Sequence, residues 1–194
     1  MNKFDHGAQI ACVSSLLGFL RKQKKTIEDC KIVIDQRVDQ EDFQIEYFEY
    51  AEQFRILFES LGANSKKVHV IHASEEDSNL IEGADVFINF SDTENLSDVM
   101  LMSLAENPIV MTMDPCDNRN AAVAKRADDA IIFTGGKSLS SLIFPYMTRA
   151  VLETEAREIN IPMKIAAAKA LDEITKRDKY MRCNDMNPIT EAII

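Results

Sequence analysis

Residues 80–115 (LIEGADVFINFSDTENLSDVMLMSLAENPIVMTMDP) constrain the fold of this chain more than any other stretch. Residues 84–90 and 108–113 are short apolar runs rich in Val, Ile and Phe, which is typical of buried strands. Between them, residues 95–106 carry apolar side chains at intervals of three and four, the spacing of a helix. Two apolar strands joined by a helical crossover predict a parallel pair with helices on both faces of the sheet.

The other segments continue this alternation. Short apolar runs at residues 31–34, 68–71 and 130–134 predict three more strands. Helices are predicted at residues 8–20, 43–61 (ended by Gly62), 118–129, 139–158 and 162–176, and a turn at residues 135–137. We therefore expect an α/β protein with three layers: a doubly wound, mainly parallel five-stranded sheet flanked by helices.

We expect a single domain over residues 1–194. Its parts are an N-terminal helix in residues 1–30, the sheet region in 31–137, and C-terminal helices with a tail in 138–194.

The composition limits which binding partners and which cellular compartment we expect. The net charge of −10 disfavours nucleic acid and anionic membranes as partners. No run of apolar residues is long enough to span a membrane, and residues 10–20 lack the flanks and cleavage site of a signal peptide. The four cysteines are scattered without a CxxC pair, which indicates reduced thiols. A cytoplasmic location follows as an expectation.

In a sheet of this kind, ligands bind beyond the carboxyl ends of the strands, near the point where the strand order reverses. The predicted strand ends supply seven candidate residues for such a site. They are Asp35, Gln36, Ser91, Asp114, Gly135, Gly136 and Lys137.

The turn after the first predicted strand argues against a dinucleotide site. Such a site needs glycines there, so that the backbone can approach the pyrophosphate. Residues 35–42 (DQRVDQED) contain no glycine, and three late carboxylates would repel a phosphate. Two unit charges about 4 Å apart near a surface interact by roughly 4 kcal/mol. Arg37 offers one opposing charge, and residues 70–74 (VIHAS) lack the acidic residue expected to hold the ribose.

Four other features have structural interpretations that we prefer. The aromatic stripe of the predicted helix over residues 43–61 indicates core packing rather than ligand stacking. His69 and His72 point to opposite faces of a strand, which disfavours a shared metal ion. Cys116 has no adjacent histidine to activate it, and Asp85 is a loop residue rather than an acid catalyst.

Several segments, in one order from about residue 4 to residue 188, resemble the C-terminal dinucleotide-binding domain of malic enzymes, the short bacterial type above all. The segments are HGAQIACVSSLLGFL (6–20), CKIVID (30–35), LIEGADVFINFSD (80–92), LAENPIVMTMDP (104–115), DDAIIFTGG (128–136), IFPYMTRAVLETEAREINIPMKIAAAKALDEI (143–174) and the tail 180–188. The resemblance implies a Rossmann-like fold. The family oxidatively decarboxylates malate to pyruvate with NAD or NADP and a divalent metal.

The chain departs from this family wherever the family does chemistry. Phe4 stands where the family has a metal-binding aspartate. Asp5 could replace that aspartate only if the alignment shifted by one residue. The family's Asn-Pro after the fourth strand is Asp114-Pro115 here, and residues 139–141 stand where asparagines contact malate. We also expect the family's other domain, which carries the catalytic tyrosine and lysine, to be missing. We therefore expect no catalytic residue and no metal ligand.

Three functional hypotheses follow. The first is a non-catalytic binding, interaction or regulatory protein, with no cofactor and with a protein partner or a homo-oligomer. The second is the cofactor domain of an oxidoreductase, working with a separate chain and using NAD or NADP if the dinucleotide site survives. The third is a small-anion site at Gly135, Gly136 and Lys137, a possible backbone nest with a cation behind it.

Overall fold

The computed structural model describes residues 6–36, 45–71, 79–90, 98–112, 129–134 and 136–177. The chain divides into two compact units, one formed by residues 23–135 and the other by residues 1–22 together with 136–194. The expectation of a single domain stays a prediction.

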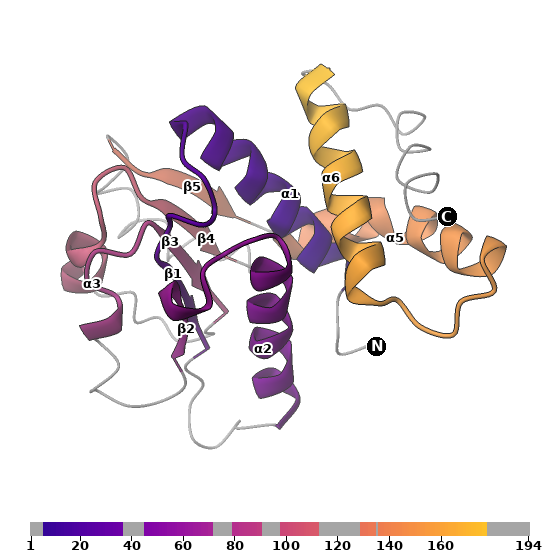
Figure 1. The fold of residues 1–194 in the computed structure, drawn as a ribbon, viewed down its shortest axis with the longest axis horizontal. Coiled ribbons are helices and arrows are strands. Elements are labelled where there is room, and N and C mark those ends of the chain that lie inside the picture. The colour runs from indigo at the N-terminus through magenta and orange to yellow at the C-terminus, as the bar shows by residue number, and fades with distance from the viewer. Residues whose placement is uncertain are drawn as a thin grey trace. The chain divides into compact units, whose positions relative to one another are not determined.

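The first unit is built on a parallel sheet of five strands in the order β2-β1-β3-β4-β5 (Figure 1). The strands are β1 (Ile32–Asp35), β2 (Val68–Ile71), β3 (Val86–Asn89), β4 (Ile109–Thr112) and β5 (Ile131–Thr134). All five lie at predicted positions, with ends that differ by at most two residues. The predicted α/β fold with a parallel five-stranded sheet is confirmed.

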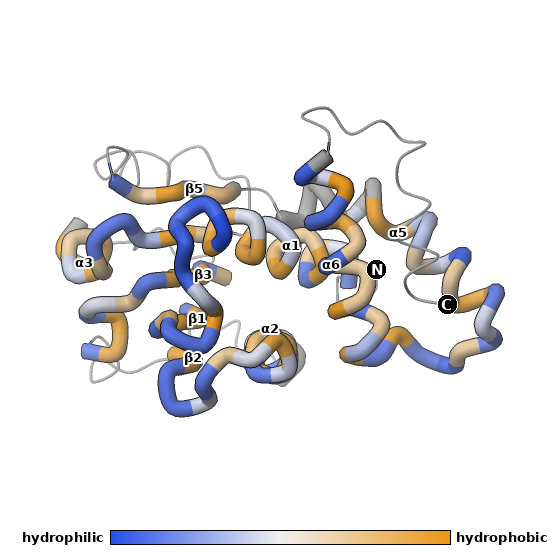
Figure 2. Tube along the Cα trace, turned by 45° about the horizontal axis from the view of Figure 1, so that its top comes forward, coloured by the Kyte–Doolittle hydropathy of each residue, from blue (hydrophilic) through white to orange (hydrophobic). Residues whose placement is uncertain are grey.

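Helices cover both faces of this sheet. Val33, Phe87 and Val110 share one row of the strand register, and their face forms a buried cluster with Leu101 of α3 (Asp98–Ser103). On the other face lies α2 (Ile45–Ser60), whose Phe54 ring is 4.8 Å from the ring of Phe90. The strands therefore run between α3 and α2, as Figures 1 and 2 show.

Helix α2 and its end follow the sequence pattern. Phe54 and Phe58 are completely buried, with ring centroids 5.8 Å apart, which confirms core packing for these two aromatics. Gly62 has φ +102° and donates its N–H to the carbonyl of Glu59 at 3.0 Å. This left-handed conformation explains why a glycine ends the helix. A short 3₁₀ turn (Ser65–Lys67) leads into β2.

At the amino ends of the strands, Asp85 has a structural role. One of its carboxylate oxygens lies 2.7 Å from the Lys25 Nζ, and the other accepts the Lys31 backbone N–H at 3.0 Å. These contacts fasten the segment before β1 to the segment before β3. Asp85 is therefore a connecting residue, as its position in the sequence suggests.

The second unit holds α1 (His6–Gln23), α5 (Gly136–Glu153) and α6 (Ile161–Arg177). Helix α1 contacts α5 closely at Gly7, where a Cβ atom would lie 2.8 Å from the Ser140 Cα. Asn160 caps α6 by accepting the Met163 backbone N–H at 3.0 Å, and Pro162 stands in the first turn, as predicted.

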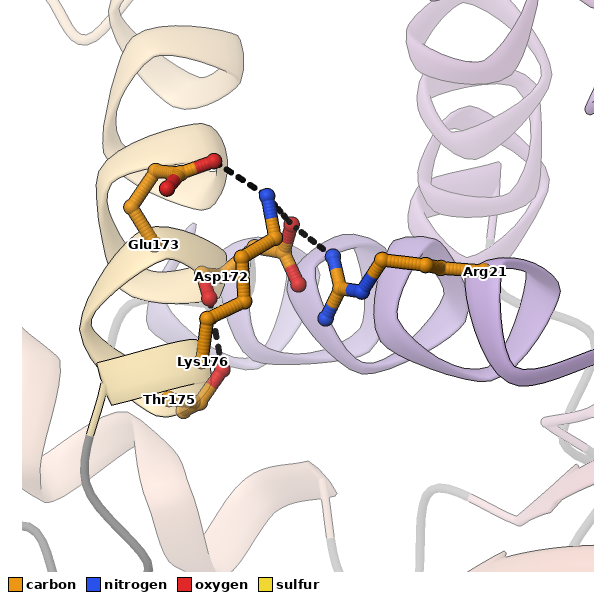
Figure 3. Close-up of polar contacts among 5 residues, drawn as sticks. All are labelled: Arg21, Asp172, Glu173, Thr175 and Lys176. Atoms are coloured by element: carbon orange, nitrogen blue, oxygen red, sulfur yellow. Dashed lines mark hydrogen bonds and ion pairs between the residues drawn. The ribbon is translucent and has the colours of Figure 1, made fainter.

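Two polar contacts join α1 to α6. The Arg21 guanidinium lies 2.7 Å from Asp172 Oδ2, and Lys176 reaches the same oxygen at 3.2 Å (Figure 3). Further along, the Lys164 Nζ donates to Gln9 Oε1 at 2.7 Å, and both side chains are buried. A buried amine against an uncharged partner is unusual, because burial disfavours its charged form.

The structure corrects three details of the predicted elements. The helix predicted at residues 95–106 ends at Ser103. The predicted turn at residues 135–137 is wrong for Gly136 and Lys137, since α5 begins at Gly136, and the end of α5 at Glu153 falls short of residue 158. Of the helix predicted at residues 118–129, residues 118–128 lie outside the described residues, as does the tail at 181–194. None of the helices in the described part is long and apolar enough to cross a membrane.

Candidate functional site

The last residues of the central strands form a polar row across the sheet. Asp35 of β1 is the register partner of Asn89 of β3, which in turn pairs with Thr112 of β4. These three residues are only 1%, 2% and 3% exposed. Because β1 lies between β2 and β3, the strand order reverses here, and this is where sheets of this kind bind ligands.

The next residue of each strand faces the opposite side. Gln36 donates its N–H to the Ile71 carbonyl at 2.9 Å, and Phe90 donates to the Asp35 carbonyl at 2.8 Å, so the ladder continues past the strand ends. Alternation along a strand then puts Gln36 and Phe90 on the face opposite Asp35. That face is the one covered by α2, because the Phe90 ring contacts Tyr50 and Phe54.

Gln36 carries an unused hydrogen-bond acceptor. The residue is 3% exposed, and its side-chain Oε1 is buried with no hydrogen-bond partner among the residues that the structure describes. Leaving a buried acceptor unpaired is costly, so such atoms call for an explanation. A donor from a ligand would satisfy it.

These side chains would bind a ligand that donates hydrogen bonds better than they would bind an anion. The strand ends present the Asp35 carboxylate, the Asn89 amide, the Thr112 hydroxyl and the Gln36 carbonyl oxygen. A carboxylate beside a phosphate would repel it, and the chain supplies no glycine there to admit a phosphate close to the backbone. Within the described ranges, no group of three or more His, Cys, Asp or Glu side chains could hold a metal ion.

The structure describes only part of the predicted set of site residues. Asp35 and Gln36 lie at the strand ends as predicted. Ser91, Asp114 and Gly135 lie outside the described residues. Gly136 and Lys137 begin α5 in the other unit. The small-anion hypothesis for them stays a prediction.

Sequence reasoning missed Asn89, Phe90 and Thr112 as part of this region. Each stands at the end of an apolar run, so a polar or aromatic residue at that boundary was an available signal. The predicted strands ended one residue too late, at residues 90 and 113, so the candidates chosen beyond them were Ser91 and Asp114.

The two buried thiols and His69 give no sign of chemistry. Burial raises the pKa of Cys30 to about 11, with the nearby Asp85 adding to the effect, so its thiolate is scarce at neutral pH. Burial also raises the pKa of Cys12. The pKa of His69 is lowered by burial and by the charge of Lys31. His72, the second member of the HxxH pattern, lies outside the described residues.

Similar proteins of known identity are malic enzymes. The NADP-dependent malic enzyme of Rhizobium meliloti (strain 1021) is 38% identical over 119 residues, which cover 55% of this chain and 16% of that protein. The bifunctional malic/malolactic enzyme of Bacillus subtilis (strain 168) is 26% identical over 196 aligned positions, covering 90% of this chain and 48% of that protein. No family model matches the chain.

Solved malic enzyme structures share the fold. The Entamoeba histolytica malic enzyme matches with a TM-score of 0.74 at 20% identity, covering 99% of this chain and 47% of that one. The Pyrococcus horikoshii enzyme gives 0.70 at 16% identity, covering 97% and 52%. The chain thus spans about half the length of these structures, and less of some curated relatives.

The resemblance drawn from the sequence is confirmed: the homologues of this chain are malic enzymes, aligned over their C-terminal part. Several are named as NAD- or NADP-dependent. The expectation that this chain binds no cofactor therefore gains no support from its relatives.

Proposed function

We propose that this chain is a non-catalytic relative of the malic enzyme dinucleotide-binding domain that works as a binding or interaction protein. One observation carries the proposal. At the carboxyl end of β1, where a dinucleotide site needs a glycine-rich turn, the chain has the buried side chains of Asp35 and Gln36. A dinucleotide would meet a carboxylate and an amide where its phosphates need backbone N–H groups.

A second point supports the loss of catalysis. The resemblance puts residues 139–141 where the family contacts malate with asparagines. Here Ser140 packs against Gly7, with its backbone oxygen 2.9 Å from where a Gly7 Cβ would be. This position serves a contact between two helices. The partner in the proposal is a protein or a second copy of the chain, and the buried thiols of Cys12 and Cys30 suit a reducing cytoplasm.

A turnover assay tests this proposal. Purified protein is incubated with malate, Mn²⁺ and either NAD or NADP, and the absorbance of the reduced cofactor is followed. We expect no reduction above the rate without protein. An intact malic enzyme measured in parallel shows that the assay works. Malate-dependent reduction by this chain alone would refute the proposal, and light scattering of the same sample would reveal self-association.

The alternative is a cofactor domain that works with a separate chain. Almost the whole of this chain, 99%, matches the Entamoeba histolytica malic enzyme structure while covering 47% of it. A fold that matches over this length could supply half of an oxidoreductase that decarboxylates malate to pyruvate. The names of the NAD- and NADP-dependent relatives favour this reading.

Complementation separates the two functions. The part of the Bacillus subtilis relative that lies outside the match is produced alone and mixed with this chain, malate, Mn²⁺ and NAD or NADP. Under the first proposal the mixture stays inactive, because a partner cannot restore glycines to the turn after β1. Activity that needs both chains would favour the alternative.

A further inference from the structure

We infer that the exposed side of α5 is a surface through which two copies of this chain pair. The inference rests on the proposed function, in which the chain binds a protein, and it names both the partner and the surface. The surface is a row of three residues spaced four apart along α5, namely Phe144, Thr148 and Leu152. We call these three residues the α5 row.

Helix α5 is apolar on two sides. On its inner side, Ile143, Met147 and Ala150 are at most 1% exposed. On its outer side, Phe144 is 62% exposed and Leu152 is 72% exposed, although both side chains are large and apolar. A helix that is apolar all round is normally covered on every side, and apolar groups gathered on a surface mark an interaction site. The inner side packs within the unit, so the outer side is available to a partner.

Thr148 does not interrupt the α5 row. Its hydroxyl donates to the Phe144 carbonyl oxygen at 3.0 Å, within the same helix. Because this donor is already used, Thr148 needs no hydrogen bond from a partner. Residues four apart form the ridges that pack into the grooves of a neighbouring helix. The α5 row therefore has the arrangement of a helix-packing surface.

The charges beside the α5 row favour a second copy of the chain as the partner. Arg149 Nε lies 2.6 Å from Glu153 Oε1, and these two side chains are 59% and 40% exposed. In a two-fold symmetric contact a surface meets its own inverted copy, so an edge with one charge of each sign is complementary to itself. A uniformly acidic or basic partner would instead meet a like charge.

The rise of the helix shows that this pairing is feasible. In an antiparallel pair centred at the level of residue 150, Arg149 of one copy lies opposite residue 151 of the other. Glu153 of the other copy is then only about 3 Å further along the axis, at roughly 1.5 Å per residue. Both charged side chains stay on the same side of the contact in each copy, so they can meet while the two α5 rows pack together.

The size of the surface predicts a weak dimer. Stable interfaces bury about 800 Å² on each partner, and a row on a single helix covers less. The net charge of −10 opposes pairing at long range, but salt at about 0.15 M limits this repulsion to about 8 Å. We expect a dissociation constant on the order of 10–100 μM.

Sedimentation velocity of the full chain, over a range of about 5–500 μM, measures the dimer. Phe144→Glu and Leu152→Glu place a charge in the α5 row, and each should weaken dimerisation at least about tenfold. Val99→Glu and Met102→Glu on α3 are the matched controls, because these apolar residues are 77% and 68% exposed but lie outside the row. The controls should dimerise like the unchanged chain. Circular dichroism of every variant checks that it is folded.

Charge reversal shows whether the contact is made between copies. Arg149→Glu makes the edge of the row wholly acidic, and Glu153→Arg makes it wholly basic. Each variant alone should dimerise about tenfold more weakly, since like charges then meet. An equal mixture of the two variants should associate again, because an acidic edge then meets a basic one. Loss of the ion pair within α5 cannot produce this recovery.

The results separate this inference from the proposed function. A dimer that the row variants weaken, that the α3 variants keep and that the mixture restores supports the inference. A chain that stays monomeric at every concentration would leave the α5 row to a different protein and overturn it. Equal weakening by the α3 variants, or no association in the mixture, would also overturn it. Each of these failures leaves the proposed function standing, because that function fails on malate oxidation by the chain alone.

Discussion

At the scale of single residues, Lys164 makes the stability of the unit formed by residues 1–22 and 136–194 depend on pH. Burial lowers the pKa of this amine from 10.5 to about 8, and its Nζ bonds to the uncharged Gln9. Below the pKa that Lys164 has in the folded state, the folded protein must hold a buried positive charge, so the desolvation cost of this charge is fully present. Between about pH 8 and pH 10.5 the unfolded state binds more protons than the folded state, and the free energy of unfolding contributed by this group rises with pH.

We therefore expect the stability of Lys164→Met relative to the unchanged protein to be highest at neutral pH and to fall by about 3 kcal/mol between about pH 8 and pH 10.5. Loss of the hydrogen bond to Gln9 lowers the stability of the variant by a constant amount and leaves this slope unchanged. Denaturant unfolding at a series of pH values measures it. Lys169→Met, the same substitution at an exposed position of α6, is the control. An advantage of Lys164→Met that stays constant with pH would contradict the explanation.

At the scale of elements, the two glycines of α1 differ in how much room their neighbours leave for a side chain. A Cβ on Gly7 would lie 2.8 Å from the Ser140 Cα and 2.9 Å from the Ser140 carbonyl oxygen, and backbone atoms cannot move aside cheaply. We expect Gly7→Ala to lower the free energy of unfolding by about 1–3 kcal/mol, as overpacking does. The midpoint of denaturant unfolding measures the loss.

Gly18→Ala is the matched comparison within the same helix. The nearest atom to a Cβ there is the Asp172 Oδ1 at 3.5 Å, an ordinary contact. Alanine favours a helix over glycine by about 1 kcal/mol, so this variant should be neutral or more stable. Equal destabilisation by both substitutions would show that helix packing at Gly7 is not the cause.

Comparison of the predicted and observed elements shows which of them the sequence predicts well. The apolar runs fixed the five strands, and Gly62 ended α2, because period and backbone conformation are local properties. The turn predicted at residues 135–137 was wrong, because α5 begins at Gly136. The prediction rested on the pair of glycines, which usually marks a turn. The candidate site was only partly predictable. Gln36 stood at a strand end, but its neighbour Phe90 depends on strand register, which links distant parts of the chain.

At the scale of the whole molecule, the net charge of −10 bears on the dinucleotide question. NAD and its relatives are anionic, so the summed field of the protein opposes their approach, in addition to the local effect of Asp35. Salt weakens such repulsion, because the screening length falls from about 10 Å at 0.1 M to about 3 Å at 1 M. A site built to hold phosphates through positive charge would respond in the opposite way.

We expect no saturable heat with NAD, NADH, NADP or NADPH at low salt, and any residual affinity should grow as salt is added. Calorimetric titrations over a range of salt concentrations measure this affinity. Micromolar binding of NAD that weakens with added salt would mean that another part of the chain cradles the pyrophosphate, and the cofactor-domain alternative would then replace the binding-protein proposal.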